Sequence, residues 1–131
     1  MKTLIADTNF YLRFILQDNP KQFKIVNEFL RKAQQRKIKI VFLSEVILEM
    51  EFVLRSVYLF SRPELTKALA GLLKVDYLAI EERDLWLETF EIFSKSSLSL
   101  FDIFLFFKAK SRKAEVLTFD KDFRKLAKIL P

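Results

Sequence analysis

The side chains in this sequence most able to do chemistry are the acids Asp7, Glu49, Asp102 and Asp120. The chain contains no His and no Cys, which removes the usual general base, the thiolate nucleophile and the common zinc ligands. Carboxylates that lie close together repel one another unless a cation neutralises them. Oxygen ligands of this kind select Mg²⁺ or Mn²⁺, and such a metal can activate water for attack on a phosphodiester. These acids are therefore the candidate catalytic and metal-binding residues.

Three of the four acids also have a purely structural explanation. Asp7 and Asp120 each stand where a helix is expected to begin, and Asp is a good helix cap. Asp102 follows Ser99 by three residues, so the pair can form a capping box with Asp in place of Glu. Each explanation is as good as the catalytic one for a single residue. Separate capping roles do not readily explain why all four acids would lie at the same edge of the sheet.

Glu49 is the acid that local structure explains least. Glu45, in the same predicted helix, suits the positive end of the helix dipole, and Glu51 has Arg55 four residues later as a surface partner. Glu49 has neither explanation and follows the like-charged Glu45 by one turn. It flanks the apolar stripe that helical spacing predicts, which consists of Val46, Met50, Val53, Leu54 and Val57.

The elements that must position these acids alternate along the chain. Periodicity predicts strands at residues 3–6, 38–42, 77–80 and 115–118. It predicts helices at about residues 10–15, 44–58, 61–74, 82–94 and 100–110. Two further helices are expected to begin at residue 20 and at residue 120. Ser44 and Ser99 are expected to cap two of these helices, Pro20 suits a first helical position, and Ser61 with Glu64 forms a capping box.

Strands separated by one or two helices imply crossover connections and a parallel sheet. We therefore expect an α/β fold, a three-layer sandwich in which helices flank a short twisted parallel sheet of four to five strands. Asp7 follows the first strand and Asp120 the fourth, so both are expected at the carboxyl edge of the sheet, where such folds bind ligands.

Composition places these elements in one domain, residues 1–131. Hydrophobic residues make up 51% of the sequence and include 15 Phe, so a packed core is expected. The Phe residues at 90, 93, 101, 104, 106 and 107 fall at helical spacing and suit a core or a dimer interface better than base stacking. Charges interrupt every apolar run, so no membrane span is expected. The first acid comes too early for a signal peptide, and we expect a cytoplasmic protein.

The net charge of +6 favours a polyanionic partner, with nucleic acid first. Basic residues gather in three segments, at residues 31–39, 108–113 and 121–128. Each segment has an alternative interpretation as a solvated helix face, which is the usual role of a charge run. Charge alone therefore suggests nucleic acid without establishing it.

Four segments together resemble the PIN-domain ribonucleases. Ile5-Ala6-Asp7-Thr8-Asn9 is similar to the opening of that family, and residues 44–56 are similar to the helix that carries its second acid, at Glu49. Residues 102–109 resemble the segment of the third acid, Asp102. Residues 117–123 resemble the closing motif, with the fourth acid at Asp120. The segments occur in the family's order and span almost the whole chain.

The resemblance implies a Mg²⁺- or Mn²⁺-dependent endoribonuclease that acts through the four acids. The size of the chain and the Glu49 segment look most like the VapC-type toxins of toxin–antitoxin pairs, which implies a homodimer and inhibition by a cognate antitoxin protein. Thr8, Asn9 and Thr118 match family positions that support the metal site. Asp122 is a further candidate, although a surface acid in a first helical turn explains it better.

The sequence departs from the family pattern in three places. Ile103 stands where a small Ala is common, Lys113-Ala114-Glu115 lacks the usual Gly, and Ile129-Leu130 provides at most a stub of the fifth strand. None of these changes removes an acid. The alternative function is a PIN-like module that binds nucleic acid or protein without cleaving. A phosphohydrolase with an aspartyl nucleophile fits poorly, because Asn9 stands two residues after Asp7 where that chemistry uses a second Asp.

Overall fold

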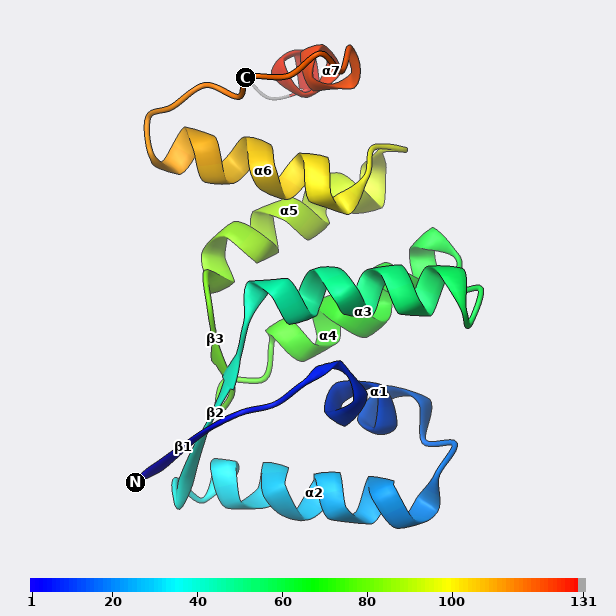
Figure 1. The fold of residues 1–131 in the computed structure, drawn as a ribbon, viewed down its shortest axis with the longest axis vertical. Coiled ribbons are helices and arrows are strands. Elements are labelled where there is room, and N and C mark those ends of the chain that lie inside the picture. The colour runs from blue at the N-terminus through cyan, green and yellow to red at the C-terminus, as the bar shows by residue number, and fades with distance from the viewer. Residues whose placement is uncertain (130–131) are drawn as a thin grey trace. The chain divides into compact units, whose positions relative to one another are not determined.

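The computed structural model describes residues 1–129, with side chains described through residue 126. Two compact units make up the chain, Met1–Glu82 and Arg83–Pro131. All strands found in residues 1–129 lie in the first unit, and the second unit contains helices and irregular segments there (Figure 1). No helix in the described part of the chain is long and apolar enough to cross a membrane.

The first unit is a small parallel sheet with its crossover helices. Its elements are, in chain order, β1 (Lys2–Ile5), α1 (Thr8–Leu16), α2 (Pro20–Gln34), β2 (Ile38–Phe42), α3 (Ser44–Ser56), α4 (Arg62–Leu73) and β3 (Ala79–Ile80). The strand order is β1-β2-β3, with Lys2 opposite Ile38 and Val41 opposite Ala79. The predicted α/β class and parallel pairing are confirmed. Parallel pairing also places the carboxyl ends of all three strands at one edge.

Helices α1 to α4 pack on one face of this sheet. Both crossovers step in the same direction across the sheet, and right-handed crossovers of that kind put their helices on the same face (Figure 1). Ile40 and Phe42 of β2 are buried, whereas Lys39, which points to the other face of the strand, is exposed. The ring of Tyr11 from α1 stacks on Phe42 with centroids 3.8 Å apart. The apolar face of β2 is therefore the centre of the core of this unit.

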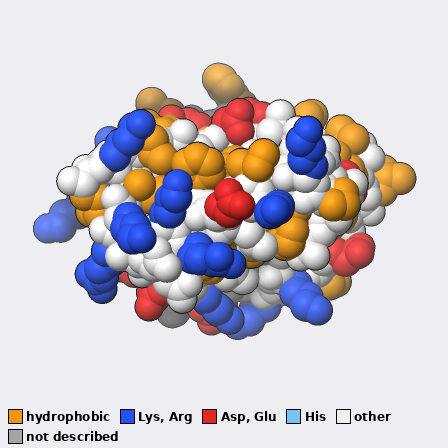
Figure 2. All heavy atoms as spheres, turned by 90° about the horizontal axis from the view of Figure 1, so that it is seen from below, with side chains coloured by type: hydrophobic (Ala, Val, Ile, Leu, Met, Phe, Trp, Pro, Cys, Tyr) orange, Lys and Arg blue, Asp and Glu red, His pale blue; other side chains and the backbone are white. Residues whose placement is uncertain are grey.

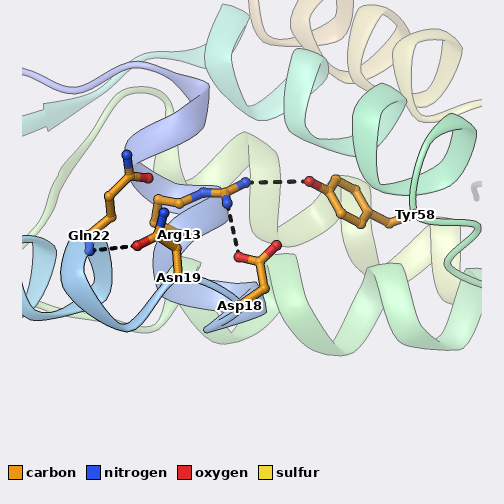
Figure 3. Close-up of polar contacts among 5 residues, drawn as sticks. All are labelled: Arg13, Asp18, Asn19, Gln22 and Tyr58. Carbon is orange, nitrogen blue, oxygen red and sulfur yellow. Dashed lines mark hydrogen bonds and ion pairs between the residues drawn. The ribbon is translucent and has the colours of Figure 1, made fainter.

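Polar contacts fix the turn between α1 and α2 (Figure 3). Asn19 caps α2 by accepting a hydrogen bond from the Gln22 N–H at 3.0 Å, and Pro20 is the first helical residue, as predicted. The Arg13 guanidinium donates to the Asp18 carboxylate at 2.9 Å and to the Tyr58 hydroxyl at 3.4 Å. Because Tyr58 follows α3, Arg13 connects the end of α1 to the end of α3.

The start of α3 differs from the sequence prediction. Ser44 was expected to cap this helix, but the cap position is Leu43, whose side chain cannot accept a hydrogen bond. The Glu81 carboxylate, which follows β3, takes that role by accepting from the Ser44 N–H at 3.2 Å, and the Ser44 hydroxyl donates to the neighbouring Glu82 carboxylate at 2.8 Å. Anionic oxygens suit the exposed N–H groups of a helix start. The predicted capping box of α4 is confirmed, with reciprocal bonds between Ser61 and Glu64.

The second unit is helical in its described part. Its helices are α5 (Arg83–Lys95), α6 (Leu100–Ser111) and α7 (Asp122–Ile129). The Trp86 ring of α5 stacks on Phe104 of α6 with centroids 3.9 Å apart. Of the aromatic residues predicted for the core, the buried ones are Phe90, Phe93, Phe104 and Phe107. Phe101 is 54% exposed, so the very apolar helix α6 does not bury its whole surface.

The prediction of a strand at residues 115–118 is wrong. These residues have no regular structure and pair with no strand in the described chain. Leu117 and the neighbouring Phe119 are fully exposed. Val116, Leu117 and Thr118 suit a strand, but a strand forms only beside a partner edge, because its hydrogen bonds run to a neighbouring strand. The sheet therefore has three strands in residues 1–129 instead of four to five, and Leu130 of the expected fifth-strand stub lies outside the described residues.

Candidate carboxylate site

Asp7 follows β1 by two residues and begins α1. Its side chain is exposed, and Oδ1 accepts a hydrogen bond from the Phe10 N–H at 3.1 Å. The capping role that the sequence left open is therefore real. A carboxylate has about four acceptor positions, so the cap leaves most of the Asp7 carboxylate able to bind a cation.

Glu49 lies in the second turn of α3, the helix that follows β2. Its side chain is exposed and forms no hydrogen bond or ion pair within the described residues. Asp7 and Glu49 thus come from the two elements that leave neighbouring strands at the carboxyl edge of the sheet. Within the described residues Glu49 is therefore an acid without a structural partner, as its position in the sequence suggested.

The predicted surface position of Glu51 in α3 is wrong. The expected pair with Arg55 exists, and the Arg55 Nε lies 3.2 and 3.1 Å from the two Glu51 oxygens, but Glu51 is buried and not on the surface. The buried residues of α3 are Ser44, Ile47, Met50, Glu51 and Leu54. Val57, predicted in the apolar stripe, is 65% exposed because the helix ends at Ser56. Burial lowers the pKa of Arg62, and the negative charge of Glu51 partly offsets this effect.

Asp102 stands in the first turn of α6, in the second unit, and is half-buried. Its N–H donates to the Ser99 hydroxyl at 3.1 Å. The reciprocal bond of a capping box, from the Ser99 N–H to the Asp102 carboxylate, does not occur among the described residues. Asp has one methylene group fewer than Glu, so it reaches back less well. The Asp102 carboxylate is thus left without a capping role.

Asp120 belongs to a short chain of hydrogen bonds that begins α7. Its N–H donates to the Thr118 hydroxyl at 2.9 Å, and its Oδ1 accepts from the Asp122 N–H at 2.8 Å. Asp122 also pairs with Lys125 at 3.3 Å. Two of the predicted supporting residues, Thr118 and Asp122, therefore hold the Asp120 backbone and side chain.

Asp120 and Thr118 line a cavity of about 630 Å³ in the second unit. Its cationic lining residues are Lys110, Lys113 and Arg124, and Phe106 and Phe123 contribute apolar surface. A carboxylate beside several cations suits a site that binds a phosphate group near a metal ligand. Lys110 and Lys113 come from the basic segment that the sequence singled out.

The other predicted supporting residues stand at the start of α1. Thr8 is 6% exposed and Asn9 is exposed. Thr8 is therefore placed to support the loop after β1 from inside, whereas Asn9 faces solvent beside Asp7.

Two of the four acids lie in each unit, Asp7 and Glu49 in the first and Asp102 and Asp120 in the second. Within residues 1–129 the structure gathers no group of three or more acidic side chains close enough to hold a metal. The donor chemistry nevertheless fits Mg²⁺ or Mn²⁺, because Mg²⁺ keeps several waters and binds through one or two carboxylates.

Sequence reasoning missed two acids at the same sheet edge. Glu81 and Glu82 follow β3 as Asp7 follows β1. The signal was present, since both come directly after the predicted strand at residues 77–80. Glu81 caps α3 through the Ser44 N–H, and Glu82 accepts from the Ser44 hydroxyl, so both acids have a structural role.

Comparison with known proteins identifies one family. The family model of the PIN domain matches residues 4–129, a range that contains all four acids. No curated protein sequence matches the chain, and no solved structure matches it either.

Proposed function

Because the chain belongs to the PIN-domain family, we propose that it is a divalent-metal-dependent endoribonuclease that hydrolyses RNA phosphodiester bonds. PIN domains have an α/β fold, are generally nucleases and typically use divalent metals. The observation that carries the proposal is the order of Asp7, Glu49, Asp102 and Asp120 within the matched range. Each stands at a helix start or on the first turns of a helix.

In this proposal the four carboxylates bind Mg²⁺ or Mn²⁺. A bound metal of this kind activates water and stabilises the negative charge that develops on the phosphate. The capping bonds of Asp7 and Asp120 fix one oxygen of each carboxylate before any ligand binds. Lys110, Lys113 and Arg124 attract the phosphate backbone toward Asp120.

We also propose that the protein is the VapC-type toxin of a toxin–antitoxin pair. Support comes from the size of the chain and from the similarity of residues 44–56 to the corresponding helix of those toxins. This proposal includes a homodimer and a cognate antitoxin protein that inhibits it. Light scattering of the purified protein tests the dimer. An upstream reading frame whose product abolishes RNA cleavage when added in equal amount tests the antitoxin.

A matched pair of variants on one helix tests the nuclease. Glu49→Gln removes a proposed metal ligand, whereas Glu45→Gln removes an exposed acid of the same helix one turn earlier. RNA cleavage in Mg²⁺ or Mn²⁺ should fall at least about 100-fold in Glu49→Gln, since even outer partners of metal ligands are worth about 10- to 100-fold. Cleavage should persist in Glu45→Gln. Equal cleavage by both variants contradicts the proposal.

The second candidate is a PIN-like module that binds nucleic acid or protein without cleaving. The observation that favours it is the capping role of Asp7 and Asp120, which accounts for these acids without a metal. Titration calorimetry with Mn²⁺ separates the two functions. Binding that disappears in Glu49→Gln supports the nuclease, and no Mn²⁺ binding at millimolar concentration supports the binding module.

A further inference from the structure

A second cavity lies at the opposite edge of the sheet from Asp7 and Glu49. Its volume is about 570 Å³, and it is formed where β2 begins and where the chain enters β3. The lining residues used below are Arg36, Lys39, Asp76 and Tyr77. Volumes of about 300 to 1,000 Å³ are usual for ligand pockets. This cavity, which we call the amino-edge cavity, is therefore large enough for a nucleotide.

The charges of the amino-edge cavity favour an anion. Arg36 and Lys39 are exposed cations, and Asp76 is the acid among the lining residues. Among the described residues, none of these three side chains takes part in a hydrogen bond or ion pair. Two cations that have not been neutralised by the protein attract anionic groups, and the attraction is greater inside a cavity than on a flat surface.

The positive charge continues along α2. Its exposed cations are Lys21, Lys24, Arg31 and Lys32, which we call the α2 basic stripe. They share one side of the helix because they follow spacings of three, seven and eight residues. Glu28 is the acid within it. With 15 residues in α2, the helix extends over about 22 Å at about 1.5 Å per residue. Figure 2 shows this side of the molecule, with Lys and Arg side chains spread over it and densest toward the left.

Arg36 occupies a backbone conformation that glycine would adopt at lower cost. Its φ is 60°, in the left-handed region. The Arg36 N–H donates to the Ala33 carbonyl at 3.0 Å and the Lys37 N–H donates to the Lys32 carbonyl at 2.9 Å. These bonds form a Schellman motif at the end of α2, in which the left-handed position is usually Gly. Replacing Arg36 by Gly therefore relieves strain and removes a cation from the cavity at the same time.

Tyr77 adds an aromatic face to the same cavity. Its side chain is half-buried at the approach to β3, beside the cations at residues 36 and 39. Aromatic side chains next to a cationic track are the arrangement by which proteins bind single-stranded nucleic acid without reading its sequence. An acidic peptide would use the cations but would not need the aromatic ring.

From these observations we propose that the amino-edge cavity and the α2 basic stripe bind single-stranded RNA. The stripe holds the phosphate backbone, Arg36 and Lys39 hold the phosphate of one nucleotide, and its base stacks on Tyr77. This surface is remote within the first unit from Asp7 and Glu49, and it extends RNA binding beyond the carboxylates. The inference rests on the proposed function only for the choice of RNA as the polyanion.

Binding in the absence of metal tests this surface separately from cleavage. A fluorescein-labelled 12-residue oligouridylate is titrated with the protein in EDTA and followed by anisotropy. Arg36→Gly and Lys39→Ala should each weaken binding about 5- to 10-fold at 100 mM salt and lower the salt slope by about 0.7, the value for one phosphate of a single strand. Lys67→Ala, which removes an exposed cation of α4, should bind within about twofold of the unchanged protein.

Thermal unfolding of Arg36→Gly separates lost charge from lost structure. Because the change relieves a left-handed backbone position, its melting temperature should be equal to or above that of the unchanged protein while its RNA affinity falls. The proposal is overturned if Arg36→Gly and Lys39→Ala both bind RNA as well as Lys67→Ala does. Because the assay contains no metal, this outcome is independent of whether the carboxylates cleave RNA.

An oligonucleotide that lacks its bases tests the role of Tyr77. The unchanged protein should bind the oligonucleotide without bases several-fold more weakly than the one with bases. Tyr77→Leu should bind the two oligonucleotides with equal affinity. An equal loss in both proteins excludes Tyr77 as the stacking residue. Polyglutamate of matched charge should not displace the RNA at equal concentration, and displacement would identify the surface as one for acidic proteins and contradict the proposal.

Discussion

Tyr11→Phe should stabilise the protein, because it removes a buried hydroxyl that has no partner. Tyr11 is 1% exposed, and its ring stacks on Phe42 with centroids 3.8 Å apart and planes at 14°. Its hydroxyl makes no hydrogen bond within the described residues. A buried polar group without a partner costs about 1–3 kcal/mol. Phe keeps the stacked ring and removes this cost.

The expected gain is about 1 kcal/mol, the lower end of that range, because removing the oxygen also leaves a small void. For a chain of this length such a gain raises the melting temperature by about 3–5 °C. Urea unfolding followed by circular dichroism measures the free energy of unfolding, and an unchanged slope with denaturant shows that the gain is in stability.

Tyr58→Phe is the matched control, and its effect has the opposite sign. The Tyr58 hydroxyl accepts a hydrogen bond from the Arg13 guanidinium at 3.4 Å, and its side chain is at the surface. Its removal should cost about 0.5 kcal/mol or less, since the bond is long and exposed. A loss of 1 kcal/mol or more in Tyr11→Phe would refute the reasoning, because it would mean that the Tyr11 hydroxyl has a partner in solution.

The pH dependence of unfolding gives an independent test of the same hydroxyl. Burial raises the pKa of Tyr11 far above its ordinary value near 10. The unfolded chain therefore loses this proton first, so the contribution is complete below pH 10 and is lost as the pH rises toward the folded pKa. The free energy of unfolding should fall by up to about 1.4 kcal/mol per pH unit above pH 10 from this group. Tyr11→Phe should lack this part of the decline.

The remaining predictions concern the helix starts and the core of the second unit. Ser61→Ala removes the capping bond to the Glu64 N–H and should lower the free energy of unfolding by about 1 kcal/mol in urea titration; no loss would mean that the capping box does not persist in solution. Hydrogen bonds from Ser61 lower the pKa of Glu64, so its contribution is present above the ordinary Glu pKa and is lost as the pH falls through the folded value; acid unfolding of Glu64→Gln should be less steep there, and an unchanged acid profile would contradict this assignment. Phe104→Ala removes the ring stacked on Trp86 and should cost about 3–5 kcal/mol, with a red shift in the fluorescence of this single tryptophan; an unshifted emission spectrum would show that Trp86 is not packed against Phe104.

Sequence patterns predicted the local elements well where each element depends on its own residues. Asn19-Pro20 and the Ser61–Glu64 capping box are local signals, and the structure has both. The cap of α3 could not be predicted in this way, since Glu81 and Glu82 reach Ser44 from 37 and 38 residues away. The sequence around Ser44 contains no information about contacts with residues so far along the chain.

The missing strand has a similar cause. Residues 115–118 have the composition of a strand, but a strand requires a hydrogen-bonded neighbour, which composition cannot supply. For the candidate site, the sequence correctly placed Asp7 after the first strand and Asp102 in the first turn of a helix. It also offered two interpretations for Asp7 and Asp120, and their capping bonds do not exclude metal binding. Metal binding by the four acids therefore stays a prediction.

The rate of RNA cleavage as a function of Mn²⁺ concentration tests the central claim most directly. Asp7→Asn and Asp102→Asn each remove one acid, the first from residues 1–82 and the second from residues 83–131. If one metal-dependent site uses all four carboxylates, both variants should lose at least about 100-fold in rate, and excess Mn²⁺ should restore part of it. Cleavage by the unchanged protein that does not depend on Mn²⁺ or Mg²⁺, or full activity in both variants, would contradict the account.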